Sequence, residues 1–184
     1  MTAGYAGGKT QLIIMRVMDA KMAFPSLLLS LLIVALLGAS IWNVIIALSL
    51  GALAPTARVM EGVTMSIKQN DYVLAARALG ATNPRILARH IFPNSMPPLI
   101  VISTVGLAGI ILAESSLSFL GLGTPEPTAT WGSMLSTGGR AHFLSNPWLA
   151  AWPGIAITLA TLSFNMLGDA LRDILDPRLR GART

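Results

Sequence analysis

Long apolar runs, interrupted by one polar stretch, dominate the pattern of this chain. The stretches 22–57 and 90–113 contain no Asp, Glu, Lys or Arg, and a further apolar run covers 148–167. A helix that crosses a bilayer needs about 20 mainly apolar residues. The first run is too long for one helix, and Gly38-Ala39-Ser40 divides it. The pattern predicts an all-α membrane protein with four transmembrane helices, at about 24–37, 41–57, 97–120 and 148–167.

The segment that follows Lys21 has a second interpretation. It combines a basic flank, the apolar core LLLSLLIVALL and a small-residue end, which are the features of a secretory signal peptide. More apolar spans follow it directly, and this favours a membrane helix. The preceding segment TQLIIMRVMDAK is weakly amphipathic and is predicted to lie along the membrane surface.

Composition supports a membrane protein. Hydrophobic residues make up 53% of the 184 residues and charged residues only 11%, whereas soluble domains carry about 25% charged residues. The chain has no cysteine, which excludes disulfides and thiolate metal sites.

The positions of the basic residues predict the orientation. Cytoplasmic loops of membrane proteins carry an excess of Lys and Arg. All thirteen basic residues except Arg140 lie on the side that also holds both chain ends. This side is therefore predicted to be cytoplasmic. The net charge of +5 then reflects topology and does not indicate a nucleic-acid partner.

The polar stretch 71–94, DYVLAARALGATNPRILARHIFPN, predicts a helix–turn–helix that we call the hairpin. Asp71 complements the dipole of the first helix, and Gly80 is a natural stop. Asn83 is expected to cap the second helix, which would run to Pro93. Its alanine-rich face would let another protein approach the backbone closely. A solvated connecting loop remains a second interpretation, while tethering at both ends argues against a DNA-reading hairpin.

The hairpin resembles the cytoplasmic "EAA" loop of permease subunits in ATP-driven (ABC) importers. That motif contains Glu-Ala-Ala, a glycine four residues after the last alanine, and a closing Ile-x-Leu-Pro. The matching residues here are Ala75, Ala76, Gly80 and Pro93. The departures are Leu74 for the glutamate, His90 for the isoleucine and Phe92 for the leucine.

Other segments are similar to the second, C-type permease of the dipeptide/oligopeptide/nickel family. They are MAFPSLLLSLLIVALLG, ILAESSLSFLGLGTPEPTATWGSML and FNMLGDALRDILDPRLRG. Members of this family usually have six spans, and this chain begins where the third is about to start. The resemblance therefore implies the C-terminal portion of a type I permease without its first two spans, arising from a fragment, a mis-assigned start codon or a decayed gene.

The resemblance implies a mechanical role. In such importers the hairpin sits in a groove of a cytoplasmic ATPase, and closure of the ATPases around ATP switches the side to which the spans open. The residues expected to line the docking surface are Asp71, Ala75, Ala76, Arg77, Gly80 and Ala81. Arg85 and Arg89 are further candidates, as partners of acidic residues on the ATPase.

The implied assembly comprises a second permease subunit, two cytoplasmic ATP-binding subunits, an extracytoplasmic substrate-binding protein and membrane lipid. The chain would be a multi-pass protein of a bacterial or archaeal cytoplasmic membrane. It is expected to be a transport subunit rather than an enzyme and to need no cofactor or metal. The sequence contains no G-x-x-x-x-G-K-[ST] motif, so ATP binding falls to the partner.

Residues outside the hairpin are further candidates. Trp131 is expected to start a short helix in the external segment, which would contact the binding protein or act as a lid on its own spans. Glu114 and Asp169 lie near opposite ends of their spans, and ionisable residues in spans are candidates for the translocation path. His90 and His142 are predicted on opposite membrane faces and so cannot share a metal.

Three alternative interpretations remain. A secondary transporter would bind substrate and ion without an ATPase. A permease fragment could lack function altogether. An intramembrane enzyme would need a convergent catalytic set, and the sequence offers none.

Overall fold

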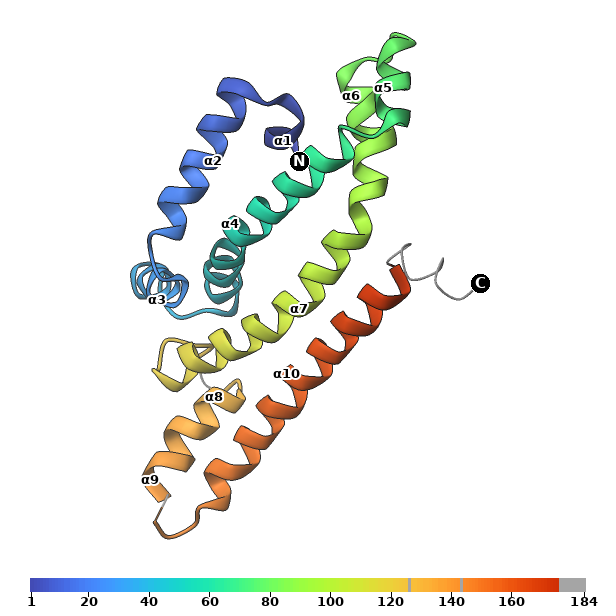
Figure 1. The fold of residues 1–184 in the computed structure, drawn as a ribbon. Helices are drawn as coiled ribbons and strands as arrows, with labels where there is room; N and C mark the ends of the chain where they lie inside the picture. The colour runs from blue at the N-terminus through green and yellow to red at the C-terminus, as the bar shows by residue number, and fades with distance from the viewer. Residues whose placement is uncertain (126, 143, 176–184) are drawn as a thin grey trace. The chain divides into compact units, whose positions relative to one another are not determined.

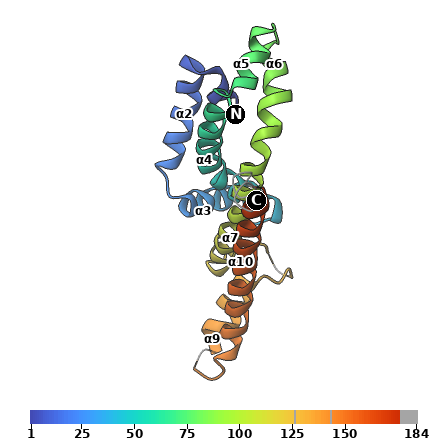
Figure 2. The same ribbon diagram turned by 45° about the vertical axis from the view of Figure 1, so that its right-hand side comes forward.

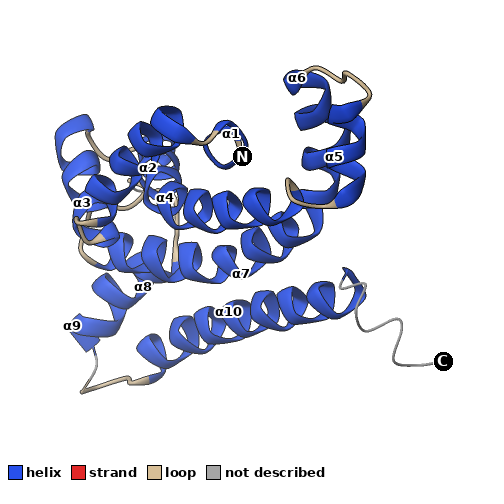
Figure 3. Ribbon diagram, turned by 45° about the horizontal axis from the view of Figure 1, so that its top comes forward, coloured by secondary structure: helices blue, strands red, loops and turns tan. Residues whose placement is uncertain are grey.

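The structure of the chain is a computed structural model that describes residues 1–125, 127–142 and 144–175. Within these ranges the chain is helical and has no strand (Figure 1, Figure 3). The first half contains α1 (Thr2–Ala6), α2 (Gly8–Met22), α3 (Ser26–Leu37) and α4 (Ile41–Ile67). The hairpin contains α5 (Asp71–Ala78), α6 (Asn83–Ile86) and the π-helical turn η1 (Leu87–Ile91). The rest contains α7 (Phe92–Phe119), α8 (Trp131–Met134), the π-helical turn η2 (Leu135–Gly139), α9 (Arg140–His142) and α10 (Trp148–Leu175).

Three of these helices are long and apolar enough to cross a membrane. They are α4, the continuous helix Asn83–Phe119, and α10. Helix α3 spans only 12 residues, or about 18 Å at 1.5 Å per residue, against a hydrocarbon core of about 30 Å. Helices α2 and α3 meet at a bend of 84° and would supply a fourth span if counted together.

The chain forms two compact units, which we describe separately. The hairpin unit contains residues 1–23, 54–103 and 168–175, and the second unit contains residues 24–53 and the described part of 104–167. Helices α4, α7 and α10 each contribute one end to each unit.

In the hairpin unit, α2 runs beside the C-terminal half of α4 (Figure 2). Helix α4 continues well past the expected span end at 57, and one face of its later turns is buried in this unit. Met60 is 4% exposed and Thr64 is fully buried. Polar contacts hold α2 to α4: the Arg58 guanidinium pairs with Asp19, and Gln11 Nε2 donates to Glu61 Oε1 at 2.7 Å.

In the second unit, α3 packs against the first half of α4. Ser30 Oγ donates to Ala47 O at 3.2 Å, and Val34 is fully buried. The turn between these helices needs Gly38, whose φ is +89°. Asn43 Nδ2 donates to Leu37 O at 3.0 Å and Gly38 O at 2.8 Å, so it satisfies carbonyls that the end of α3 leaves free.

The segment after α7 folds back onto that helix in the second unit. Thr130 and Ser133 form a reciprocal capping box at the start of α8, so the short helix expected at Trp131 is confirmed. Gly132 lies directly against α7, because a Cβ at this position would come within 2.2 Å of Ser115 O. A side chain here has no room.

We therefore expect the substitution Gly132→Ala to destabilise the packing of α8 on α7. Overpacking of this kind typically costs about 1–3 kcal/mol, which would lower the thermal unfolding midpoint of the detergent-solubilised protein. Gly138→Ala is the matched control, because nothing lies within 4 Å of a Cβ at that position. Equal midpoints for the two variants would contradict the close approach of Gly132 to Ser115.

Candidate functional site: the hairpin

The first arm of the hairpin, α5, ends where the sequence predicts. Asp71 lies in its first turn and Arg77 in its last, so both complement the helix dipole. Gly80 follows with φ +80°, a left-handed conformation that glycine adopts without the penalty of a Cβ. This glycine ends the first helix and turns the chain into the second arm.

The second arm starts differently from the prediction. Thr82 occupies the N-cap position with an extended backbone, and Asn83 is the first helical residue. The prediction that Asn83 caps this helix is therefore wrong. Its side chain instead accepts a hydrogen bond from the hydroxyl of Tyr5 at 2.8 Å. Pro84 lies in the first turn, where its missing N–H costs little.

The second arm does not end at Pro93. Helix α6, the π-helical turn η1 and α7 form one continuous helix from Asn83 to Phe119. In η1 the Phe92 N–H bonds to Leu87 O, five residues back, which widens the helix just before Pro93. Asn94 Nδ2 then donates to His90 O at 2.6 Å. The helix continues through Pro93, which has no N–H to donate, and the wide turn lies directly before it.

A small buried core holds the two arms together. Val73 on the first arm and Ile86 and Ile91 on the second are fully buried, and they pack with Ile67 and Tyr5. The rings of Tyr72 and His90 lie 6.3 Å apart across the arms. The hairpin thus has its own apolar core, which argues against a solvated connecting loop.

The predicted docking residues lie mostly on the surface of the hairpin. Two of them, Ala76 and Ala81, are half-buried, and Ala81 packs against the hairpin core. The exposed residues are Asp71, Ala75, Arg77, Gly80, Arg85 and Arg89. No bound partner tests their role, so the docking assignment stays a prediction.

Sequence reasoning missed the apolar tip of the hairpin. Leu79, next to Gly80, is 89% exposed, and Leu74 is 48% exposed. A leucine at the end of a polar loop, directly before a turn glycine, is the signal that could have identified this feature. Leu74 is the position at which the resembling motif has a glutamate, so an apolar side chain faces outward where a charge is expected.

Sequence reasoning also missed Tyr5, which lies far from the hairpin in the chain. Its hydroxyl donates to Asn83 Oδ1, and the Arg77 guanidinium lies over its ring at 5.8 Å from the centroid. Lys68 Nζ donates to the Tyr5 carbonyl at 3.1 Å. No local sequence signal connects these positions, because the contacts depend on tertiary packing.

The candidate residues of the second unit are Glu114 and Trp131, and their described contacts do not indicate a chemical role. Glu114 is half-buried and accepts a hydrogen bond from Ser118 Oγ at 2.6 Å. Trp131 is 42% exposed. The described residues contain no group of three or more His, Asp or Glu side chains that could hold a metal ion.

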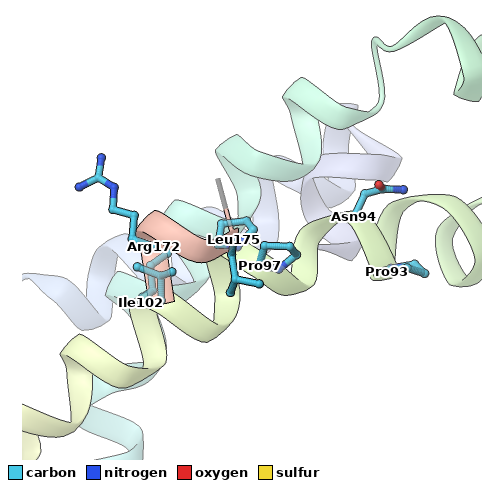
Figure 4. A pocket seen from close by; sticks show the side chains of 8 residues that line it. Pro93, Asn94, Pro97, Ile102, Arg172 and Leu175 are labelled. Atoms are coloured by element: carbon cyan, nitrogen blue, oxygen red, sulfur yellow. The ribbon is translucent and has the colours of Figure 1, made fainter. Parts of the chain in front are cut away.

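One pocket of about 550 Å³ lies within the hairpin unit, beside the start of α7. It is lined mainly by apolar groups, and none of the predicted site residues belongs to it. The Arg172 side chain extends away from Pro97 and Leu175 (Figure 4). Since few polar groups converge here, the pocket does not present the pattern of a specific polar ligand site.

Comparison with known proteins places this arrangement in a family. Residues 1–181 match the family model of the binding-protein-dependent transport system inner membrane component. A Brucella suis chain named as a peptide transport system permease protein is 48% identical over 91% of this chain. The dipeptide transport system permease protein DppC of Alkalihalophilus pseudofirmus is 42% identical over 98% of it. The glutathione transport system permease protein GsiD of Escherichia coli is 42% identical over 96% of it.

The chain covers 56% of the Brucella relative, 59% of the Alkalihalophilus relative and 58% of the Escherichia coli relative. It thus spans a little more than half the length of these proteins. The match nevertheless covers the hairpin and all the long helices. The chain is a multi-pass membrane protein, and it belongs to the family of binding-protein-dependent transport system inner membrane components.

Proposed function

We propose that this chain is part of a permease subunit of an ATP-driven importer of peptides or related small solutes. Its hairpin would dock on a cytoplasmic ATPase, and a second permease subunit, a second ATPase and an extracytoplasmic binding protein would complete the assembly. The names of the relatives, which cover peptide, dipeptide and glutathione transport, support this substrate class. The basic residues around the hairpin favour a cytoplasmic location for it and for both ends of the chain.

One observation carries the proposal: an exposed apolar tip on a hairpin that continues directly into a membrane helix. Tyr72, Leu74 and Leu79 are all exposed on the first arm of the hairpin, and several exposed apolar side chains on one short segment suit a protein interface. The hairpin core fixes the tip to α6, and α6 continues without a break to Phe119. A partner that moves the tip would therefore move the helix.

The length of this helix supports transmission of a hairpin movement to the membrane spans. The helix Asn83–Phe119 contains 37 residues, which corresponds to about 55 Å at 1.5 Å per residue. Crossing a hydrocarbon core of about 30 Å takes about 20 residues, so the helix has more residues than one crossing needs. ATP stabilises only the closed state of the ATPases. Through this helix, their closure would shift the equilibrium between the two states of the spans, which open to opposite sides of the membrane.

The exposed leucine allows a direct test of docking. Leu79→Asp places a charge at the centre of the proposed interface, and loss of a central anchor typically costs at least about 2 kcal/mol, or roughly a 30-fold weaker Kd. We expect the variant to insert normally but to lose the ATPase during purification of the complex. Leu144→Asp is the matched control, since Leu144 is 99% exposed and lies outside the hairpin. If Leu79→Asp retains the ATPase as well as Leu144→Asp does, the tip is not the docking surface.

The alanine face gives a second test. Ala76→Glu should uncouple ATP hydrolysis from peptide uptake because a bulky charged side chain prevents close approach of the partner. Ala75→Glu should do the same at a position that is already exposed, where the hairpin core is not disturbed. The measurement is uptake of a labelled dipeptide by vesicles, divided by ATP hydrolysed, with Ala170→Glu on α10 as control. Normal ratios in both hairpin variants would refute the docking assignment.

The same experiments separate the alternatives. A secondary transporter would take up the dipeptide in a proton- or sodium-dependent manner, without a P-loop ATPase in the purified complex. A fragment without function would insert but would neither bind an ATPase nor support uptake.

A further inference from the structure

The two arms of the hairpin are joined by more than their own core. Tyr5, in the short helix α1, is 9% exposed and packs against Val73 and Ile86 from outside the hairpin. Its hydroxyl lies between the two arms. It donates to Asn83 Oδ1 on the second arm at 2.8 Å and accepts from Arg77 on the first at 3.5 Å. One side chain thus contacts both sides of the turn.

Helix α1 is in turn fixed to α4. Gly4 lies so close to that helix that a Cβ would come within 2.7 Å of Glu61 O. Lys68, just after the end of α4, donates to the Tyr5 carbonyl at 3.1 Å. Through Tyr5, the hairpin is therefore attached to α4 at a second place, besides the covalent connection at 68–70.

The attachment extends to α2. Helix α1 connects to α2 through Gly7 and Gly8, which both have positive φ and form a tight turn. The Gln11–Glu61 hydrogen bond and the Arg58–Asp19 ion pair then hold α2 against α4. All these residues belong to the hairpin unit, so the contacts form one continuous chain from the hairpin turn to α2.

We propose that Tyr5 is a positioning residue: it holds the two arms of the hairpin against α1, so that displacement of the hairpin also moves α1 and α2. This inference rests on the proposed function, since it assumes that a partner displaces the hairpin. It adds a second route of transmission to the continuous helix Asn83–Phe119. The route depends on the hydrogen bond from the Tyr5 hydroxyl to Asn83, which a single substitution can remove, and on the contact of the Tyr5 ring with Arg77.

The absence of native cysteine makes the motion of α2 measurable. Lys9→Cys introduces a single thiol at an exposed position in the first turn of α2. In vesicles that carry the assembled importer, we would measure the rate of maleimide labelling of this thiol with and without ATP. The rate should differ between the two states when Tyr5 is intact.

Two substitutions remove the attachment on either side of the hydrogen bond. Tyr5→Phe removes only the hydroxyl, and Asn83→Ala removes its acceptor. Each should reduce the ATP-dependent difference in labelling rate at least three-fold, and the double variant should reduce it no further. Tyr72→Phe is the matched control, because Tyr72 is the other tyrosine of the chain and is 42% exposed on the same hairpin. It should retain the full difference.

A second pair of variants tests α1 independently of the hydroxyl. Gly4→Ala should displace α1 from α4 and give the same loss, whereas Gly62→Ala, with nothing within 4 Å of its Cβ, should not. Every variant is also assayed for co-purification of the ATPase, which should be unchanged because none of these residues lies in the exposed apolar tip.

The outcomes separate the two proposals. Full ATP dependence in Tyr5→Phe, or equal losses in Tyr5→Phe and Tyr72→Phe, would overturn the positioning role while docking stands. An importer that contains the ATPase but shows no ATP-dependent labelling of the parent Lys9→Cys chain would overturn it as well. A parent chain that binds no ATPase would instead overturn the proposed function.

Discussion

Residues 83–119 form one helix although Pro84, Pro93, Pro97 and Pro98 all lie in it. Pro84 costs little in the first turn, whereas Pro93, Pro97 and Pro98 each remove an N–H donor from the helix interior. Around these prolines lie the π-helical turn at 87–91 and two side-chain hydrogen bonds, from Asn94 to His90 O and from Ser95 to Phe92 O. Because the helix stays unbroken, the second arm of the hairpin is the start of a membrane helix rather than part of a loop between two helices.

The parts of the fold that follow from local chemistry could be predicted from the sequence. The uncharged runs located the long helices, Gly80 marked the turn of the hairpin, and Trp131 marked a short helix. The second arm could not be predicted correctly. Pro93 indicated a helix end, and only the tertiary packing of Ile91 and the local π-helical turn allow the helix to continue. At this position the burial of Ile91 outweighs the local tendency of Pro93 to end a helix.

The exposed surface of the hairpin could be predicted from the sequence, whereas its side-chain contacts could not, and its docking role stays a prediction. The alanine-rich surface of the first arm is exposed around Ala75, as the helical spacing indicates. Asparagine before proline is typical of a helix start and predicts a cap at Asn83. The structure assigns that cap to Thr82 and directs Asn83 to Tyr5, 78 residues away in the chain. A contact of this sequence separation leaves no local pattern, so single-sequence reasoning could not find it.

The exposure of Leu79 has a consequence for the chain before it finds its partners. In a free subunit, Leu79 is 89% exposed and Leu74 is 48% exposed, so the hairpin presents apolar side chains to water. A cell that makes more permease than ATPase would hold copies of the chain that invite aggregation or recognition by quality-control proteases. Under the proposed docking, a partner that covers this tip would also protect the chain from these losses.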